Sequence, residues 1–226
     1  MLPTKQLMAA SVRSSRILLD TFKEQVRLLE EAGVLTRINN SEWAAPTFLI
    51  RKKDGKSARF ISDFCELNKR RLRKPYRISR IQDMLQRMEG LTWVSAIDLN
   101  MGYYHINLSP ESRQLCTIVL PWGKYSYNKL PMGLCNSPDI FQEKMNELFA
   151  GFEEVLVYID DILIVTKGSF ADHVEKLERA LLLLRDAGLK VNVKKSFFAQ
   201  KETEYLGLTR YLRYLVIVDS HFVQIV

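Results

Sequence analysis

The clearest pattern of apolar and polar positions lies between Val155 and Val165, where two apolar runs rich in β-branched residues flank the adjacent acids Asp160 and Asp161. Runs of this length and composition predict strands. Two of them joined by a two-residue polar step predict a β-hairpin with the acids at its tip. Aspartate is a common turn residue, so a simple chain reversal explains the acids. Two like charges at a tip without glycine repel each other, however, and a bound cation that removes this cost is an equal alternative.

Apolar residues at helical spacing predict amphipathic helices elsewhere in the chain. These helices are predicted over residues 18–32, over residues 81–88, from Ser137-Pro138 onward, and from Ser169 to the glycine at position 188. A Ser followed by Pro, and a Ser three residues before an Asp, are both typical helix starts. Residues 1–17 are polar and aperiodic, and we expect them to form a flexible tail.

Short extended runs lie between these helices. They are predicted at residues 47–50, 58–61, 94–99, 115–120, 125–130, 190–193 and 204–208, with a basic turn at residues 51–55. Because hairpins and helices are interleaved, the pattern predicts an α+β fold rather than a parallel doubly wound sheet.

Composition adds four expectations. The 226 residues are 47% hydrophobic, enough for the core of one domain or of two closely packed subdomains. The 33 basic and 26 acidic residues suit a polyanionic partner, although many proteins with a net charge of +7 bind none. Three widely spaced cysteines form neither a zinc pattern nor a disulfide framework, which favours a reducing compartment. No secretory signal and no apolar run of about 18 residues is found, so we expect a soluble protein of the cytoplasm or nucleus, without a membrane partner.

A third acid, Asp98, lies inside an apolar run, where a carboxylate is costly unless it is paired. If its strand lies beside the hairpin of Asp160 and Asp161 in one sheet, three carboxylates converge with no basic residue among them. Such a set holds hard divalent cations, and Mg²⁺ is usual where phosphates complete the shell. Two such ions can serve phosphoryl transfer. Asp63 also follows an apolar run but lies near basic residues, so we interpret it as part of a structural ion pair.

Three motifs occur in the order found in reverse transcriptases. They are Asp98-Leu-Asn-Met-Gly-Tyr-Tyr-His-Ile106, then Leu130-Pro-Met-Gly-Leu-Cys-Asn-Ser-Pro138 followed by Phe141-Gln142, and then Tyr158-Ile-Asp-Asp161. Trp43 to Gly55, Leu67-Asn-Lys69 and Asn192 to Phe198 add further matches. Residues 18–207 thus resemble the polymerase of gypsy-type LTR retrotransposons.

The resemblance implies a right-hand polymerase fold with fingers and palm subdomains and an antiparallel palm sheet covered by helices. The fingers would comprise about residues 18–73 and 106–136, and the palm about residues 74–105 and 137–207. The activity implied is RNA-directed DNA polymerisation, a nucleotidyl transfer that adds deoxynucleotides to a primer 3′-hydroxyl on an RNA or DNA template. The cofactor implied is a pair of Mg²⁺ ions, for which Mn²⁺ can substitute.

The resemblance also implies roles for single residues. The catalytic metal ligands would be Asp98, Asp160 and Asp161. The nucleoside triphosphate would be bound by Lys52, Arg59, Tyr103, Met132 and Lys195. Primer and template would be contacted by Pro131, Gly133, Tyr158, Leu206 and Gly207. A Lys point charge and an Arg fork are natural phosphate ligands, and a bulky Tyr can exclude a ribose 2′-hydroxyl. Without the resemblance, Lys52 and Arg59 would be read as a solvated turn and Tyr103 as a core residue.

The sequence departs from the family pattern in two places. Cys65 stands where the family commonly has arginine, which predicts looser fingers. After Gly207 the pattern stops, so residues 208–226 are an unmatched tail and no thumb is expected. The uncharged run Leu215 to Val218 can add a strand or, if unpaired, promote aggregation. The alternatives to an active polymerase are therefore a weakly active or inactive nucleic-acid-binding remnant and a recruited interaction scaffold.

Overall fold

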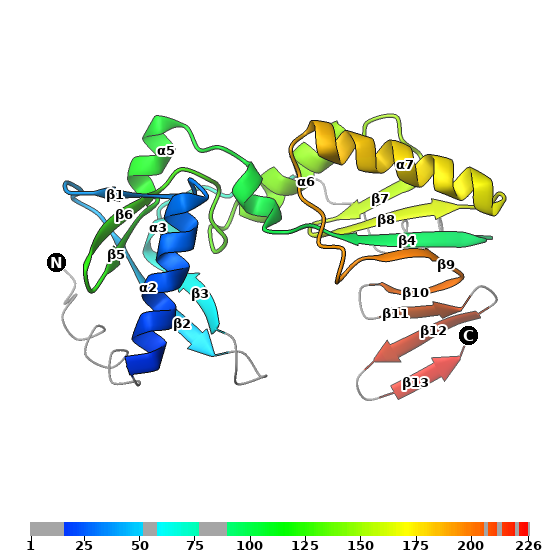
Figure 1. The fold of residues 1–226 in the computed structure, drawn as a ribbon, viewed down its shortest axis with the longest axis horizontal. Helices are drawn as coiled ribbons and strands as arrows, with labels where there is room; N and C mark the ends of the chain where they lie inside the picture. The colour runs from blue at the N-terminus through cyan, green and yellow to red at the C-terminus, as the bar shows by residue number, and fades with distance from the viewer. Residues whose placement is uncertain are drawn as a thin grey trace. The chain divides into compact units, whose positions relative to one another are not determined.

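The computed structural model describes residues 16–51, 58–76, 90–205, 208–211, 214–219 and 222–225 (Figure 1). The predicted helix at 81–88, the basic turn with Lys52, and the predicted primer contacts Leu206 and Gly207 lie outside the described residues. The structure combines helices with three largely antiparallel sheets, which confirms the predicted α+β class. The contacts divide the chain into unit 1, Met1–Lys74 with Tyr103–Ser137, and unit 2, Pro75–Gly102 with Pro138–Val226.

Unit 1 contains a five-stranded sheet with the strand order β1-β6-β5-β2-β3. Its strands are β1 (Leu35–Ile38), β2 (Ala45–Arg51), β3 (Ala58–Ser62), β5 (Thr117–Leu120) and β6 (Gly123–Tyr127). All neighbours pair antiparallel except β2 and β5, which run parallel. The helices of unit 1 are α2 (Arg16–Glu31), α3 (Cys65–Lys69) and α5 (Pro110–Leu115), and a 3₁₀ turn, η1 (Gly102–His105), lies at the unit boundary.

The predicted first helix corresponds to α2, whose apolar face is buried. Phe22 on that face makes edge-to-face ring contacts with Phe60 and Trp122. The helix ends at Glu31, and Gly33 follows in the turn with a φ of +68°, the left-handed conformation found after many helices. Burial of this apolar stripe, rather than intrinsic helix propensity, therefore holds α2 in place.

The short helix α5 was not predicted from the apolar pattern. Its residues include Leu115, which the pattern placed in a strand, and the strand β5 begins only at Thr117. None of its side chains is buried, so it leaves no helical periodicity in the sequence. The usable signal was at its start, where Ser109 accepts a hydrogen bond from the Ser112 amide and is followed by proline.

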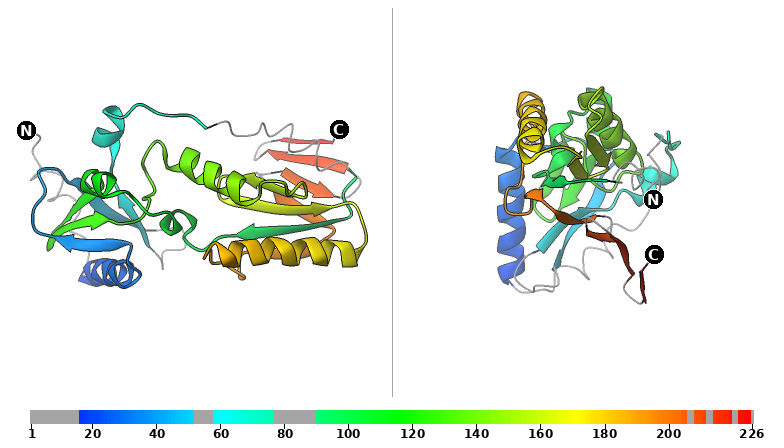
Figure 2. Two further views of the ribbon diagram at one scale, coloured as in Figure 1. Left: turned by 90° about the horizontal axis from the view of Figure 1, so that it is seen from above. Right: turned by 90° about the vertical axis from the view of Figure 1, so that its right-hand side faces the viewer.

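Unit 2 contains a four-stranded sheet with the order β7-β8-β4-β9. The strands are β4 (Trp93–Asp98), β7 (Val155–Tyr158), β8 (Asp161–Thr166) and β9 (Phe197–Gln200). The helices α6 (Ser137–Leu148) and α7 (Phe170–Asp186) lie side by side on one face of this sheet (Figures 1 and 2). A second antiparallel sheet follows, formed by β10 (Glu202–Tyr205), β11 (Leu208–Tyr211), β12 (Tyr214–Asp219) and β13 (Phe222–Ile225).

Two predicted strands of unit 2 differ in the structure. The run at 190–193 makes only an isolated bridge, from Val191 to Leu99, because the chain turns directly after it. The run at 204–208 contributes to two strands, β10 and β11. The apolar run Leu215–Val218 lies within β12, which pairs with β11 on one side and with β13 on the other. No helix in the described part of the chain is long and apolar enough to span a membrane.

A buried polar cluster joins α7 to the sheet. The His173 ring contacts two hydroxyls, Ser95 Oγ at 2.8 Å from Nε2 and Thr166 Oγ1 at 2.9 Å from Nδ1. The Ala199 amide donates to the same Ser95 oxygen at 2.9 Å, which brings β9 into the cluster. A neutral imidazole has one donor and one acceptor, and the two hydroxyls satisfy both. Burial lowers the pKa of His173, and the nearby charge of Asp172 opposes this only in part.

The free energy of unfolding is therefore expected to fall as the pH drops below about 6.5, the ordinary pKa of histidine. The folded-state pKa is depressed, so the unfolded chain takes up a proton that the folded chain excludes. The contribution of neutral His173 to the free energy of unfolding is fully present above about pH 6.5. It is lost as the pH falls toward the lower pKa of the folded state, by at most about 1.4 kcal/mol per pH unit. Urea unfolding at several pH values measures it. The variant His173→Gln should show a flatter pH dependence, and an unchanged slope would contradict this role.

Candidate active site

The alignment of two strands places two of the predicted metal ligands together. In the antiparallel pair of β4 and β8, Asp98 lies directly opposite Asp161. Directly opposed side chains on one face of such a pair have Cβ atoms about 4.5–5.5 Å apart. Tyr158 of β7 pairs with Asp161 from the other side. The strand that carries Asp98 thus lies beside the hairpin that carries the other acids.

The electrostatics of the pair are unfavourable without a cation. The pKa of Asp161 is raised, first by partial withdrawal of its carboxyl from water and second by the charge of Asp98, although much of the Asp161 side chain stays exposed. Like charges directly opposite each other destabilise a sheet. A divalent cation between the two carboxylates would offset both effects.

The hairpin turn differs by one residue from its prediction. Tyr158 pairs with Asp161, so Ile159 and Asp160 form the two-residue turn and Asp161 is already the first residue of β8. The prediction that both acids form the tip is therefore wrong. Ile159 has a φ of +54°, a left-handed conformation that costs an L-residue about 1–2 kcal/mol. A β-branched residue adopts it only where the surroundings impose it.

The buried side chain of Gln142 on α6 contacts this turn. The Ile159 amide donates to Gln142 Oε1 at 2.7 Å, and Gln142 Nε2 donates to the Val157 carbonyl at 3.0 Å. Gln142 Nε2 is also 2.9 Å from Asn146 Oδ1, one helical turn further along. The side chain is 1% exposed. In the sequence, Gln142 was recognised only as part of a motif, and no role was predicted for it.

A basic residue does lie among the acids, contrary to the prediction. Lys195 Nζ is 3.7 Å from Asp98 Oδ2 in an ion pair whose side chains are 67% and 38% exposed. The turn that carries Lys195 is bound to the backbone of Asp98, since the Asn192 amide donates to the Asp98 carbonyl and Ser196 Oγ accepts from the Asp98 amide. Exposed ion pairs contribute about 0–1 kcal/mol, so Lys195 lies near the acids but can leave Asp98 with little loss of free energy.

The residues present fit a Mg²⁺ site in which the protein supplies only part of the ligands. Among residues 16–51, 58–76 and 90–201 and the described strands beyond, no three His, Cys, Asp or Glu side chains are grouped as a metal cage. Mg²⁺ in nucleotide enzymes is usually held by one or two carboxylates together with substrate phosphates. The opposed carboxylates of Asp98 and Asp161, with Asp160 in the adjoining turn, fit a site that the substrate completes.

In unit 1 a braced loop presents Met132. The Asn68 side chain makes two hydrogen bonds to this loop. Its Nδ2 donates to the Gly133 carbonyl at 2.8 Å, and its Oδ1 accepts from the Cys135 amide at 2.9 Å. Gly133 has a φ of +97°, and a Cβ there would lie 3.2 Å from the Ser62 carbonyl oxygen. Met132 is 52% exposed, whereas the adjacent Pro131 is buried. The loop geometry therefore requires glycine and leaves the methionine accessible.

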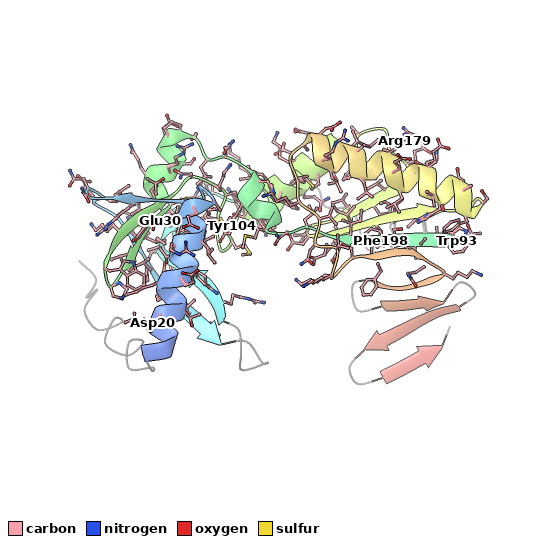
Figure 3. The ribbon with its side chains drawn as sticks, viewed as in Figure 1. Asp20, Glu30, Trp93, Tyr104, Arg179 and Phe198 are labelled. Carbon is pink, nitrogen blue, oxygen red and sulfur yellow. The ribbon has the colours of Figure 1, made fainter. Side chains whose placement is uncertain are left out.

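The remaining predicted residues of unit 1 have mixed positions. Arg59 is exposed on β3, opposite Ile50. Tyr103 in η1 is buried, with 8% of its surface exposed. Its neighbour Tyr104, labelled in Figure 3, packs near Tyr127, with the ring centroids 6.2 Å apart. The structure thus brings Asp98, Asp161, Tyr158 and Lys195 together in unit 2, with Asp160 in the adjoining turn. Convergence of all three carboxylates and the approach of the unit 1 residues to them stay predictions.

Asp63 has a hydrogen-bond partner in addition to the basic residues predicted for it. Its main partner is Cys65, whose amide donates to Asp63 Oδ1 at 2.9 Å. The hydrogen bonds from Cys65 lower the pKa of Asp63, and the charge of Lys69 contributes less. The carboxylate therefore binds the backbone of the first residue of α3, and the charge of Lys69 adds a weaker ionic interaction. Whether Cys65 loosens the fingers stays a prediction.

The architecture corresponds to the fingers and palm region of a polymerase. The fold matches Prototype Foamy Virus Protease-Reverse Transcriptase with a TM-score of 0.79 and 29% identity, over 87% of this chain and 26% of that chain. A foamy viral protease-reverse transcriptase in complex with RNA/DNA hybrid matches with a TM-score of 0.82 and 22% identity, over 91% of this chain and 27% of that chain.

Sequence comparison defines the family. Residues 50–210 match the family described as Reverse transcriptase (RNA-dependent DNA polymerase). The chain is 34% identical over 193 residues to the Enzymatic polyprotein of Soybean chlorotic mottle virus, which is 83% of this chain and 28% of that protein. It is 28% identical over 197 residues to the Retrovirus-related Pol polyprotein from transposon gypsy of Drosophila melanogaster, which is 83% of this chain and 19% of that protein. The chain belongs to the reverse transcriptase family and spans less than a third of these relatives.

Proposed function

We propose that the chain is the polymerase domain of a retroelement and extends a primer on an RNA template with deoxynucleotides. The observation that carries this proposal is the opposition of Asp98 and Asp161 beside the turn of Asp160, in a chain of the reverse transcriptase family. The match to a foamy viral protease-reverse transcriptase in complex with RNA/DNA hybrid supports the choice of template and primer. The three unpaired cysteines agree with a reducing compartment, the cytoplasm or the nucleus.

The acids and Lys195 would divide the work in unit 2. Asp98, Asp160 and Asp161 would hold two Mg²⁺ ions, for which Mn²⁺ can substitute, and these ions supply charge stabilisation for phosphoryl transfer. Lys195 is held beside Asp98 by a weak, exposed pair, so it is free to turn to an incoming polyphosphate. Its charge would then stabilise the pyrophosphate that leaves. Tyr158, Leu206 and Gly207 would contact the primer.

The residues of unit 1 would bind and select the nucleotide. Lys52 and Arg59 would bind the triphosphate, and Tyr103 would limit the sugar to one without a 2′-hydroxyl. The loop from Pro131 to Gly133 would present Met132 to the sugar and base, and its bracing by Asn68 fixes where the methionine stands. These assignments rest on the family resemblance and on the exposure of Arg59 and Met132.

Primer extension tests the proposal directly. The 226-residue chain, given an RNA template, a labelled DNA primer, deoxynucleotides and Mg²⁺, should lengthen the primer, and removal of Mg²⁺ with a chelator should stop the reaction. Binding is expected to weaken steeply with added salt, because it rests on contacts to phosphates. Binding to the hybrid without any extension, in Mg²⁺ or Mn²⁺, would contradict the proposal and favour a nucleic-acid-binding remnant.

A further inference from the structure

We infer that Gln142 is a positioning residue that holds the turn of Ile159 and Asp160 in the shape that sets the acids of the site. The inference rests on the proposed function for its meaning, but its geometry is independent of it. Ile159 takes a left-handed backbone that its branched side chain disfavours, with a φ of +54°. Asp160 follows it directly, and Asp161 is the next residue. Any change of backbone at Ile159 therefore turns both carboxylates.

Gln142 bonds to the backbone where β7 enters this turn. Its Oε1 accepts from the Ile159 amide at 2.7 Å, and its Nε2 donates to the Val157 carbonyl at 3.0 Å. One side chain thus spans the last part of β7 and the first residue of the turn. Ile159 is a β-branched residue, so its own sequence does not favour the positive φ that this two-residue turn requires. The fixed conformation is explained by the amide of Gln142, which is itself locked between Asn146 and the sheet.

A purely packing role would need neither of these bonds. Gln142 is 1% exposed, and an apolar residue would fill the same volume without a polar group to satisfy. The bond lengths and the pairing of donor with acceptor indicate instead that the amide acts on the turn backbone. Partners that orient metal ligands typically affect affinity or activity by about 10- to 100-fold. We therefore expect an effect of this size.

Gln142→Met tests the role, because methionine keeps the length and volume but cannot donate or accept as the amide does. Hydrogen exchange of the Ile159 amide should be slow in the unchanged chain and faster in the variant. Affinity for Mn²⁺, followed by its paramagnetic broadening of nearby NMR signals, should fall about 10-fold or more. In primer extension, kcat should fall by a similar factor while KM for the nucleotide changes less than about twofold.

Two control variants on the same helix separate positioning from folding. Glu143→Ala and Glu147→Ala each change an exposed acid on α6 and leave both the Gln142 amide and its partner Asn146 in place. Both should leave Ile159 exchange and Mn²⁺ affinity unchanged. An unprotected Ile159 amide in the unchanged chain, or normal Mn²⁺ affinity and kcat in a folded Gln142→Met variant, would overturn the inference. A chain that extends no primer would refute the proposed function alone, since the exchange of Ile159 still decides the role of Gln142.

Discussion

Asp160→Asn is expected to lower primer extension by roughly a hundredfold or more and to leave the fold intact. The substitution keeps the size of the side chain and removes one negative charge from the turn beside Asp98 and Asp161. Loss of one preorganised electrostatic group typically reduces kcat by about 10²–10³-fold. Asp161→Asn should have an effect of the same order, because Asp161 lies directly opposite Asp98. Single-turnover primer extension in Mg²⁺ and in Mn²⁺ measures both.

A distant acid provides the matched control. Asp186 is exposed at the end of α7 and pairs with its neighbour Arg185. Asp186→Asn makes the same change of charge and should keep normal extension. The unfolding midpoints of Asp160→Asn and Asp186→Asn should agree closely, and that of Asp161→Asn should be no lower without metal, because this variant removes a like charge opposite Asp98. Extension at the normal rate by Asp160→Asn would remove this residue from the catalytic set.

Tyr103→Ala is expected to let the enzyme incorporate ribonucleotides. If the ring lies under the incoming sugar, its removal relieves a clash with the 2′-hydroxyl. A steric difference of about one heavy atom is worth roughly 10- to 200-fold in selectivity. The ratio of kcat/KM for a deoxynucleotide to that for the matching ribonucleotide should therefore fall by such a factor. Tyr103 is buried, so the variant should also lose some stability, which thermal unfolding measures separately.

Tyr104→Ala is the matched control for this result. Tyr104 is the next residue in η1 and packs near Tyr127 in the interior of unit 1. Its loss should reduce stability without altering the choice of sugar. A selectivity ratio that stays the same in Tyr103→Ala, or falls equally in Tyr104→Ala, would show that Tyr103 is a core residue and nothing more.

Features encoded locally could be predicted from the sequence. Continuous apolar runs predicted both strands of the hairpin, which are buried at consecutive positions, and the strand of Asp98. Helical spacing of apolar residues predicted α2, which buries one face. The family motifs selected the acids. The position of the turn could not be predicted, since a two-residue period is compatible with a reversal at Ile159-Asp160 or at Asp160-Asp161. The register of β8 with β7 and β4, together with the contact with Gln142, selects the first.

The contacts made by residues near the acids could not be predicted, although the resemblance placed Lys195 among the nucleotide-binding residues. Lys195 comes close to Asp98 only because the turn after Asn192 is hydrogen-bonded to the Asp98 backbone. The buried cluster of His173 depends on hydroxyls from β4 and β8, and neither Ser95 nor Thr166 stands out in an apolar run. Such contacts are set by strand order and register, which the pattern of one strand does not contain.

The division of the chain into two units has a consequence for the order of folding. Each unit is made of two separate segments, because the chain leaves unit 1 after Lys74, returns at Tyr103 and leaves again after Ser137. During synthesis, β2 can pair with β5 only after the later segment of unit 1 has been made. In unit 2, β4 likewise pairs with β8 only after the later segment has been made. Closing such long loops before their contacts form slows folding. Unit 1 can nevertheless be completed first on the ribosome, since all its segments emerge before α7. Neither unit is a continuous stretch of sequence, so expression of one unit alone would require its two segments to be joined by a new linker.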